Sequence, residues 1–224
     1  MSELFSIQLQ NRQQQGGDGV WLDLPTTTER VQAALRQIGI SSDNPQGLFI
    51  SGYFAEEEKR FAIPYNMVLA SNVDELNFLA SRLETLSTGE RAELNAALQA
   101  PQSELFSIGR ITDFPENVDY YVHLPDVHGP AQLGDYYLNR SGMVDMPEEW
   151  KGGIDTAQFG RYVAQQEQGV FTEYGYLVKS GDEWQKVHEG QPVPDEYRVL
   201  SFPASEILRD AANIPPPVQP EREP

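Results

Sequence analysis

The stretch from Val73 to Leu98 constrains the fold most, because it is the only part of the chain with sustained helical periodicity. Leu76, Leu79 and Leu83 recur at spacings of three and four, which places them on one face of a helix. A second apolar stripe follows, and Pro101 ends it. The pattern predicts a central helical hairpin.

Two capping boxes mark the starts of these helices. Asn72 pairs with Glu75, and Ser87 with Glu90, at the spacing of a reciprocal cap. The apolar stripes predict a buried face, so the opposite face should form an acidic wall. Its acids are Asp74, Glu75, Glu84, Glu90 and Glu93, against Arg82 and Arg91.

The residues before the hairpin predict a small antiparallel sheet with one helix on it. Apolar and polar residues alternate from Phe5, as in a half-buried strand, and further strands are expected at 20–24 and 48–54. Thr26 with Glu29 should cap a helix that ends at Gly39.

The hexapeptide Ser103–Ile108 repeats Ser2–Ile7, although the flanking residues differ. The first copy is predicted as strand and the second as helix, with Ser103 as its cap and Leu105 on its buried face, because context overrides propensity in short segments.

The rest of the chain predicts a mixture of short strands and helices. A strand is expected at 118–123, and helices are expected to begin at Pro130, Pro147 and Asp155. The helix that begins at Asp155 should bury Phe159, Tyr162 and Val163. The remaining expected elements are a hairpin of 170–179 with 183–187, a strand at 197–200, a helix at 204–212 and a disordered Pro-rich tail at 215–224.

The fold class is therefore α+β, built from small modules. The expected divisions are an N-terminal α+β module at 1–70, the helical hairpin at 71–101, a C-terminal acidic α+β module at 102–200, and a short helix with a disordered tail at 201–224.

Charge narrows the range of partners. The chain holds 34 acidic residues against 16 lysines and arginines, and residues 71–150 hold fourteen against four. Such a field repels nucleic acid and attracts basic proteins. The chain has no cysteine, no apolar run long enough to cross a membrane and no signal peptide, so the expected location is cytoplasmic.

No converging set of nucleophile, base and charge stabiliser is evident, so no enzyme activity, cofactor or metal is expected. His123 and His128 flank Asp126, but Pro125 makes this segment irregular and a third ligand at a standard spacing is lacking. The glycine-rich run 16–19 precedes a strand, which argues against a phosphate-binding loop.

A second acidic stretch lies between Asp113 and Asp155. Neighbouring helical turns place side chains about 5–6 Å apart, similar to the step between phosphates, so an elongated acidic surface can occupy a DNA-binding channel. A solvated face is the alternative. The nine acids are Asp113, Glu116, Asp119, Asp126, Asp135, Asp145, Glu148, Glu149 and Asp155, against Arg140 and Lys151.

The sequence resembles the ArdA antirestriction family over roughly Val20 to Val199. The segments that carry this resemblance are VWLDLP at 20–25, IGI at 38–40, DELNFLA at 74–80, LGDYY at 133–137, VDMPE at 144–148, IDTAQFGR at 154–161 and FTEYGY at 171–176.

The resemblance implies an elongated, homodimeric, cytoplasmic DNA mimic of mobile genetic elements, which binds the DNA-binding groove of type I restriction-modification enzymes. It also implies an antirestriction region at 133–155, so Asp135, Asp145, Glu148, Glu149 and Asp155 are the first choice of functional residues. The acids of the hairpin and of 113–126 would extend this track. The alternative function is an acidic adaptor or regulator that binds another basic protein without imitating DNA.

Overall fold

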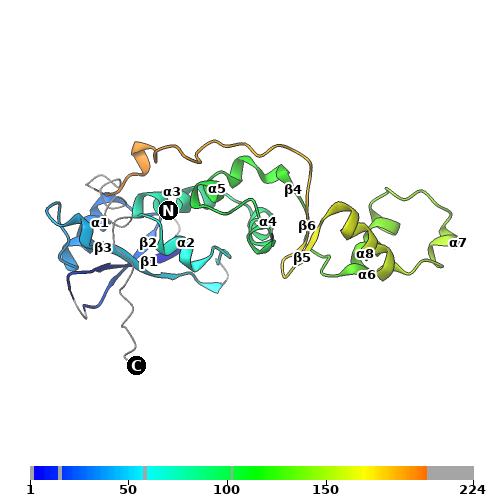
Figure 1. The fold of residues 1–224 in the computed structure, drawn as a ribbon, viewed down its shortest axis with the longest axis horizontal. Helices are drawn as coiled ribbons and strands as arrows, with labels where there is room; N and C mark the ends of the chain where they lie inside the picture. Colours follow the sequence, from blue (N-terminus) through cyan, green and yellow to red (C-terminus); the bar gives the residue numbers. More distant parts are fainter. Residues whose placement is uncertain (1–2, 15–16, 58–59, 102, 201–224) are drawn as a thin grey trace, which may run out of the picture.

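The computed structural model describes residues 3–14, 17–57, 60–101 and 103–200. A three-stranded sheet forms one end of an elongated α+β molecule, and a helical lobe forms the other (Figure 1). In this sheet β1 (Phe5–Asn11) lies between β2 (Val20–Leu24) and β3 (Leu48–Phe54), antiparallel to both. These strands were predicted, and alternate residues of β1 are buried as expected.

Helix α1 (Thr28–Gln37) packs beside this sheet and buries Val31 and Leu35. Its N-cap is Thr27, whereas the sequence predicted Thr26. The backbone N–H of Thr26 instead donates to Asn77 Oδ1 at 2.7 Å, which fixes Thr26 in the core.

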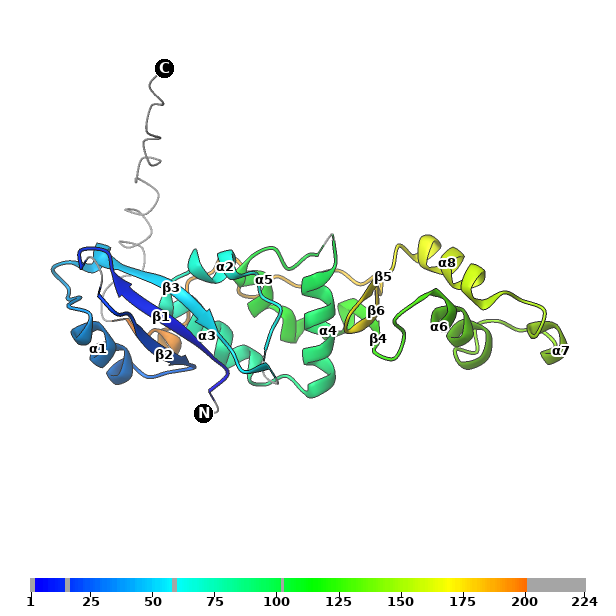
Figure 2. The same cartoon turned by 90° about the horizontal axis from the view of Figure 1, so that it is seen from below.

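Helices α2 (Tyr65–Leu69), α3 (Val73–Leu83) and α4 (Thr88–Gln99) follow, and both predicted capping boxes are present. The N–H of Glu75 donates to Asn72 Oδ1 at 2.9 Å, and the N–H of Glu90 donates to Ser87 Oγ at 3.3 Å. Helix α3 contacts β2 and α5 (Ile108–Thr112), while α4 crosses the long axis and contacts the second sheet (Figure 2). The central helices therefore join the two sheets.

The second copy of the hexapeptide is not helical from Ser103, as had been predicted. Helix α5 (Ile108–Thr112) begins only after Ser107, whose Oγ accepts from the N–H of Arg110 at 3.2 Å. Ser103 Oγ accepts from Leu105 N–H in an irregular turn, at 3.1 Å. The cap is the last serine of the segment because its hydroxyl is the one placed beneath the free N–H groups of the helix.

The second sheet contains β4 (Tyr121–Leu124), β6 (Gly175–Lys179) and β5 (Val170–Thr172), in that order and antiparallel. The strand predicted at 118–123 starts later, because 118–120 form a 3-10 turn. The predicted hairpin of 170–179 with 183–187 is wrong, since the turn falls within 170–179 and 183–187 is not a strand. No strand forms at 197–200 either.

The far end of the molecule, which we call the distal lobe (residues 125–169), is helical. It holds α6 (Pro130–Asp135), a π-helical turn (Tyr136–Arg140), α7 (Glu148–Lys151) and α8 (Thr156–Glu167). Helices α6 and α8 meet through glycines: a Cβ on Gly160 would lie 1.8 Å from the Pro130 carbonyl oxygen. Gly134 and Gly160 make this contact, and Gly160 is the buried residue of α8. Phe159, Tyr162 and Val163 were predicted to be buried, but Phe159 and Val163 are half-buried and Tyr162 is 60% exposed.

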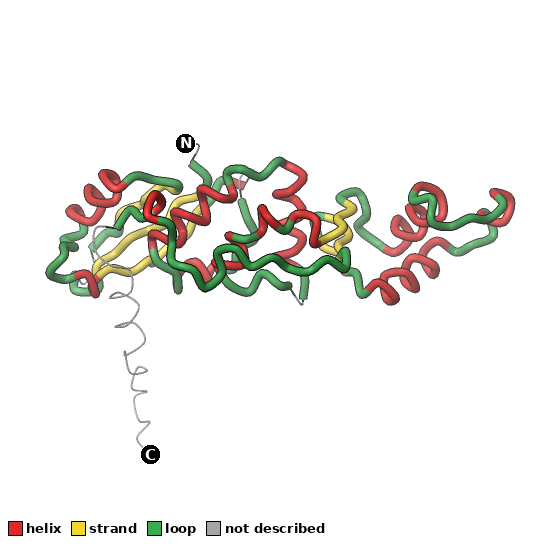
Figure 3. The backbone as a smooth tube through the Cα atoms, turned by 90° about the horizontal axis from the view of Figure 1, so that it is seen from above, coloured by secondary structure: helices red, strands yellow, loops and turns green. Residues whose placement is uncertain are grey.

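The chain then returns along the body in an extended segment, which we call the return strap (residues 180–200; Figure 3). It runs from the second sheet back to α3 and the first sheet, with one 3-10 turn at Asp195–Tyr197. Its backbone is held by polar side chains of α3 and of the segment after α5. The predicted helix at 204–212 and the Pro-rich tail lie outside the described residues.

Two hydrophobic clusters hold the described chain together. The larger extends from Leu4 to Val199 and spans both sheets, α3 and α4. The smaller joins Val127, Leu133 and Tyr176 at the base of the distal lobe. The predicted division at 70 and 101 falls within the larger cluster and stays a prediction. Among the described helices, none is long and apolar enough to span a membrane.

Candidate functional site

The distal lobe presents six of the predicted acids. Asp126 precedes α6, Asp135 ends it, Asp145 lies in the loop before α7, Glu148 and Glu149 form the first turn of α7, and Asp155 caps α8. All are exposed except Asp135, which is half-buried. Figure 1 shows α7 at the tip of the molecule, so Glu148 and Glu149 lie at its extreme end.

Helix ends explain why carboxylates are placed here. Asp155 Oδ1 accepts from the N–H groups of Ala157 and Gln158 at 2.9 and 3.0 Å. Glu148 and Glu149 occupy the first turn of α7, where the helix dipole favours negative charge. These three acids therefore stabilise the lobe locally while their charge faces solvent.

Two of the three lysines and arginines of the distal lobe form ion pairs with these acids. Arg140 Nη2 lies 3.1 Å from Asp135 Oδ2, and Lys151 Nζ lies 2.6 Å from Glu148 Oε1. Among the described residues, Asp145 and Glu149 form no ion pair. The lobe therefore keeps a net negative surface.

A second acidic group lies on the body, around α4 and the 3-10 turn Val118–Tyr120. Glu93 is half-buried, and burial followed by the neighbouring charges of Glu90 and Asp119 raises its pKa to about 8. The hydrogen bond from the Ser87 hydroxyl lowers the pKa of Glu90. Glu93 thus carries a proton at neutral pH, and Glu90 and Asp119 carry the charge of this group.

Glu116 and Glu84 complete the predicted acids on this side of the body. Glu116 forms an ion pair with Arg82, which neutralises it locally. Glu84 follows α3 as its C-cap and is half-buried. Their contribution to a charged surface is smaller than that of Asp119, which is exposed and is in no ion pair of the described chain.

Two predicted acids are not on the surface. Asp74 is 4% exposed, and its Oδ1 accepts from the N–H groups of Val199 and Leu200 at 2.7 and 2.9 Å. Asp113 is fully buried and accepts from the N–H groups of His188 and Glu189. Both carboxylates bind the backbone of the return strap. Asp74 is therefore not part of the predicted acidic wall, and Asp113 is not part of the exposed acidic surface.

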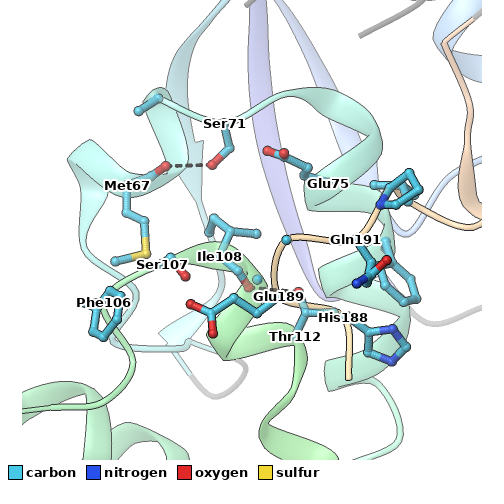
Figure 4. A pocket seen from close by; sticks show the side chains of 16 residues that line it. Met67, Ser71, Glu75, Phe106, Ser107, Ile108, Thr112, His188, Glu189 and Gln191 are labelled. Carbon is cyan, nitrogen blue, oxygen red and sulfur yellow. Dashed lines mark hydrogen bonds between the residues drawn. The ribbon is translucent and has the colours of Figure 1, made fainter. Parts of the chain in front are cut away.

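Glu75 faces away from the other acids. It lines a hollow between α2, α3, α5 and the return strap, together with Glu189 (Figure 4). The sequence could not predict this position, since one side of the hollow is formed by residues 188–193, more than 100 positions further along the chain than Glu75.

The histidines are not brought together. His123 Nε2 lies 2.7 Å from the Tyr174 carbonyl oxygen, whereas His128 is exposed before α6. No cluster of three potential metal ligands occurs in the described parts of the chain.

Exposed apolar side chains on the distal lobe were missed from the sequence. Met143, Trp150 and Tyr162 are 75%, 67% and 60% exposed. Trp150 follows directly after Glu149 in the short α7, and this proximity to exposed acids was the available signal. Acidic and apolar groups thus share the end of the molecule.

Comparison with known proteins gives one family. Residues 17–178 match the family described as Antirestriction protein (ArdA). The match takes in both sheets in part and the whole distal lobe, and it ends before the return strap. No curated protein matches the chain.

Proposed function

The chain belongs to the ArdA antirestriction protein family, and we propose that it inhibits type I restriction-modification enzymes by occupying their DNA-binding groove as an acidic DNA mimic. The observation that carries this proposal is the group of exposed carboxylates on the distal lobe. Asp145 and Glu149 stand there with no ion pair among the described residues, at the end of an elongated molecule.

The proposed mechanism is equilibrium competition. Carboxylates replace phosphates, contact the lysines and arginines of the groove and release the counterions held there. Each surface pair contributes only about 0–1 kcal/mol, so binding depends on many acids together. The protein acts as an inhibitor and catalyses no reaction in this proposal.

The remaining features belong to the same proposal. The protein works in the cytoplasm, where restriction enzymes meet incoming DNA, it is encoded by a mobile genetic element, and it acts as a homodimer. A dimer doubles the number of carboxylates available to one enzyme and lengthens the charged surface.

The first experiment measures competition with a short target duplex for a purified type I restriction-modification enzyme, at several salt concentrations. We expect the protein to displace the duplex, and we expect its affinity to fall steeply as salt rises. If duplex and protein bind the enzyme together, the adaptor function replaces mimicry.

A triple variant tests the assigned surface. Asp135→Asn, Asp145→Asn and Glu148→Gln together remove three charges while sparing the cap of α8. We expect affinity for the enzyme to fall roughly 10- to 100-fold, at up to about 1 kcal/mol for each charge. Fluorescence anisotropy of the labelled duplex in competition measures the change.

The matched control removes three exposed charges at the other end of the molecule, by Asp18→Asn, Glu29→Gln and Asp43→Asn. The net charge is the same in both variants, so a difference between them reports position. Equal affinities would refute the assignment to the distal lobe.

A further inference from the structure

A hollow of about 580 Å³ lies on the body of the molecule, away from the distal lobe. Helices α2, α3 and α5 form three sides, and residues 188–193 of the return strap form the fourth (Figure 4). The family match ends at residue 178, so this fourth side lies outside it. The hollow is therefore a feature of this chain that the family match does not assign.

The hollow has an acidic lining. Glu75 and Glu189 contribute carboxylates from opposite sides, and no lysine or arginine of the described chain lines it (Figure 4). The Glu75 carboxylate forms no ion pair among the described residues, and the one hydrogen bond that it accepts there is long, 3.4 Å, from the Asn72 N–H of the capping box. A cation in the hollow would supply the missing partner.

Glu189 is partly satisfied. Its Oε1 accepts from Arg110 Nε at 3.1 Å, and Lys186 Nζ lies 3.6 Å from its Oε2. That second oxygen is buried and accepts no hydrogen bond from the described residues. Glu189 therefore holds Arg110 in place, and its carboxylate adds negative charge to the wall of the hollow.

An aromatic ring stands at the rim. Phe106 is 63% exposed, although Arg110 Cζ lies 4.5 Å from the centre of its ring. The ring therefore keeps most of its surface exposed to solvent. Met67 and Ile108 supply apolar surface between this ring and Glu75 (Figure 4).

These features match a guanidinium group. A guanidinium stacks on an aromatic face, donates several hydrogen bonds to carboxylates, and is joined to an aliphatic stem that packs on apolar side chains. An ammonium would gain the charge but lose the planar stacking. An anion would be repelled by the carboxylates of Glu75 and Glu189.

We propose that this hollow, which we call the arginine pocket (Met67, Glu75, Phe106, Ile108 and Glu189), binds an arginine side chain presented by a partner protein. The inference rests on the proposed function only for the identity of that partner, because a DNA-binding groove is rich in arginine. The pocket adds a specific contact to a surface otherwise based on dispersed charge.

The test is a titration of the full-length ¹⁵N-labelled protein with N-acetyl-arginine amide, followed by NMR. We expect saturable shifts of the amides at 107–109, 188–191 and 193, with a roughly millimolar dissociation constant. The citrulline analogue has the same shape without the charge, and we expect it to bind at least about tenfold more weakly. Absent shifts, or equal binding of the two, would overturn the proposal.

A second comparison separates the two sources of a guanidinium. Free arginine carries an α-amino and an α-carboxyl group that a side chain within a protein lacks. Tighter binding of free arginine than of the capped form would assign the pocket to the amino acid and overturn docking of a partner. Equal or weaker binding of free arginine supports the partner.

Matched variants test the residues. Glu75→Gln should weaken binding of the capped arginine about fivefold, whereas Glu90→Gln, at the same position of the other capping box, should not. Glu189→Gln is compared with Glu104→Gln, because both carboxylates bind Arg110 and only Glu189 lines the pocket. Phe106→Ala should weaken binding by a similar factor.

The titration and the competition experiment fail independently. If the protein displaces duplex from the enzyme but the capped arginine does not bind, the pocket proposal falls and mimicry stands. If the capped arginine binds without any competition, the pocket stands and its partner is another protein.

Discussion

Asp113 and Asp126 carry the same side chain thirteen positions apart and do opposite things. Asp113 is fully buried and accepts two backbone N–H groups of the return strap, at 2.6 and 3.2 Å. Asp126 is exposed in the loop before α6. Surroundings, not residue type, decide which acids of this chain can face a partner.

Replacing Asp113 should therefore destabilise the protein. Asp113→Ala leaves two partly buried N–H groups without their acceptor, and we expect the free energy of unfolding to fall by about 2–3 kcal/mol. Asp126→Ala, the control, should change it by less than about 0.5 kcal/mol. Urea denaturation followed by circular dichroism measures both, and equal losses would contradict the role given to Asp113.

Glu93 makes stability depend on pH. The unfolded chain loses this proton near the ordinary value of 4.5, whereas the folded protein keeps it up to about pH 8. The folded state binds more protons across this window, so the free energy of unfolding should fall as pH rises from about 4.5 to about 8.

Glu93→Gln should remove that dependence, because an amide has no proton to lose. We expect the variant to be more stable than the wild type by about 1–2 kcal/mol at pH 8, after allowance for solvent around this half-buried group, and similar to it at pH 4.5. Thermal unfolding at several pH values measures this difference. Glu149→Gln, on the exposed tip, is the control and should leave the pH profile unchanged.

At the scale of elements, the contact between α6 and α8 depends on glycine at positions 134 and 160, because a side chain there would collide with the other helix. A Cβ on Gly134 would lie 2.0 Å from the Thr156 carbonyl oxygen, and one on Gly160 would lie 1.8 Å from that of Pro130. Neither backbone atom can move without separating the helices. Small residues here allow the two helices to approach closely.

Gly160→Ala should therefore loosen the distal lobe alone. We expect faster hydrogen exchange in 130–167, unchanged exchange in the first sheet, and weaker inhibition of the restriction enzyme. Gly152→Ala is the control, since nothing lies within 4 Å of a Cβ at that position. Equal exchange in the two variants would show that the close contact does not hold the lobe.

Elements with local signals could be predicted from the sequence, and those with distant partners could not. Both capping boxes, the three N-terminal strands and the Asp155 cap depend on residues within a few positions of each other. The irregular path of residues 183–200 depends on acceptors such as Asp74, 125 positions away from Val199. The spacing of apolar residues within a segment cannot predict a contact with a residue so far away in the sequence.

The same reason explains the errors in the candidate site. Asp74 occupies the second position of an amphipathic helix, and the pattern placed it on the outer face. The return strap covers that face, so Asp74 is 4% exposed. The exposed acids of 126–155 were easier to predict, because the distal lobe is thin and few of its residues lie in a core.

At the scale of the whole molecule, the return strap joins what the chain order separates. Asp74, Asn77, Asp113 and Asn117 all bind its backbone, and Val199 enters the larger hydrophobic cluster. The strap thus links α3 to the segment after α5 along one side of the body (Figure 3).

Ending the chain after Ser180 should remove these contacts. We expect a loss of about 4–7 kcal/mol from the buried hydrogen bonds and the Val199 side chain, a large part of the stability of a domain. A chain that ends after Leu200 keeps every one of these contacts and is the control. Similar midpoints of urea unfolding for the two chains would contradict this role of the strap.

The strap also orders events during synthesis. Asp74 and Asn77 leave the ribosome long before residues 197–200 exist, so the nascent N-terminal half holds polar groups whose acceptors or donors have not yet been translated. Val199 can join the larger hydrophobic cluster only after these residues emerge. A chain stalled before that point presents an unfinished body to chaperones and proteases, and completed translation becomes a condition for a stable inhibitor.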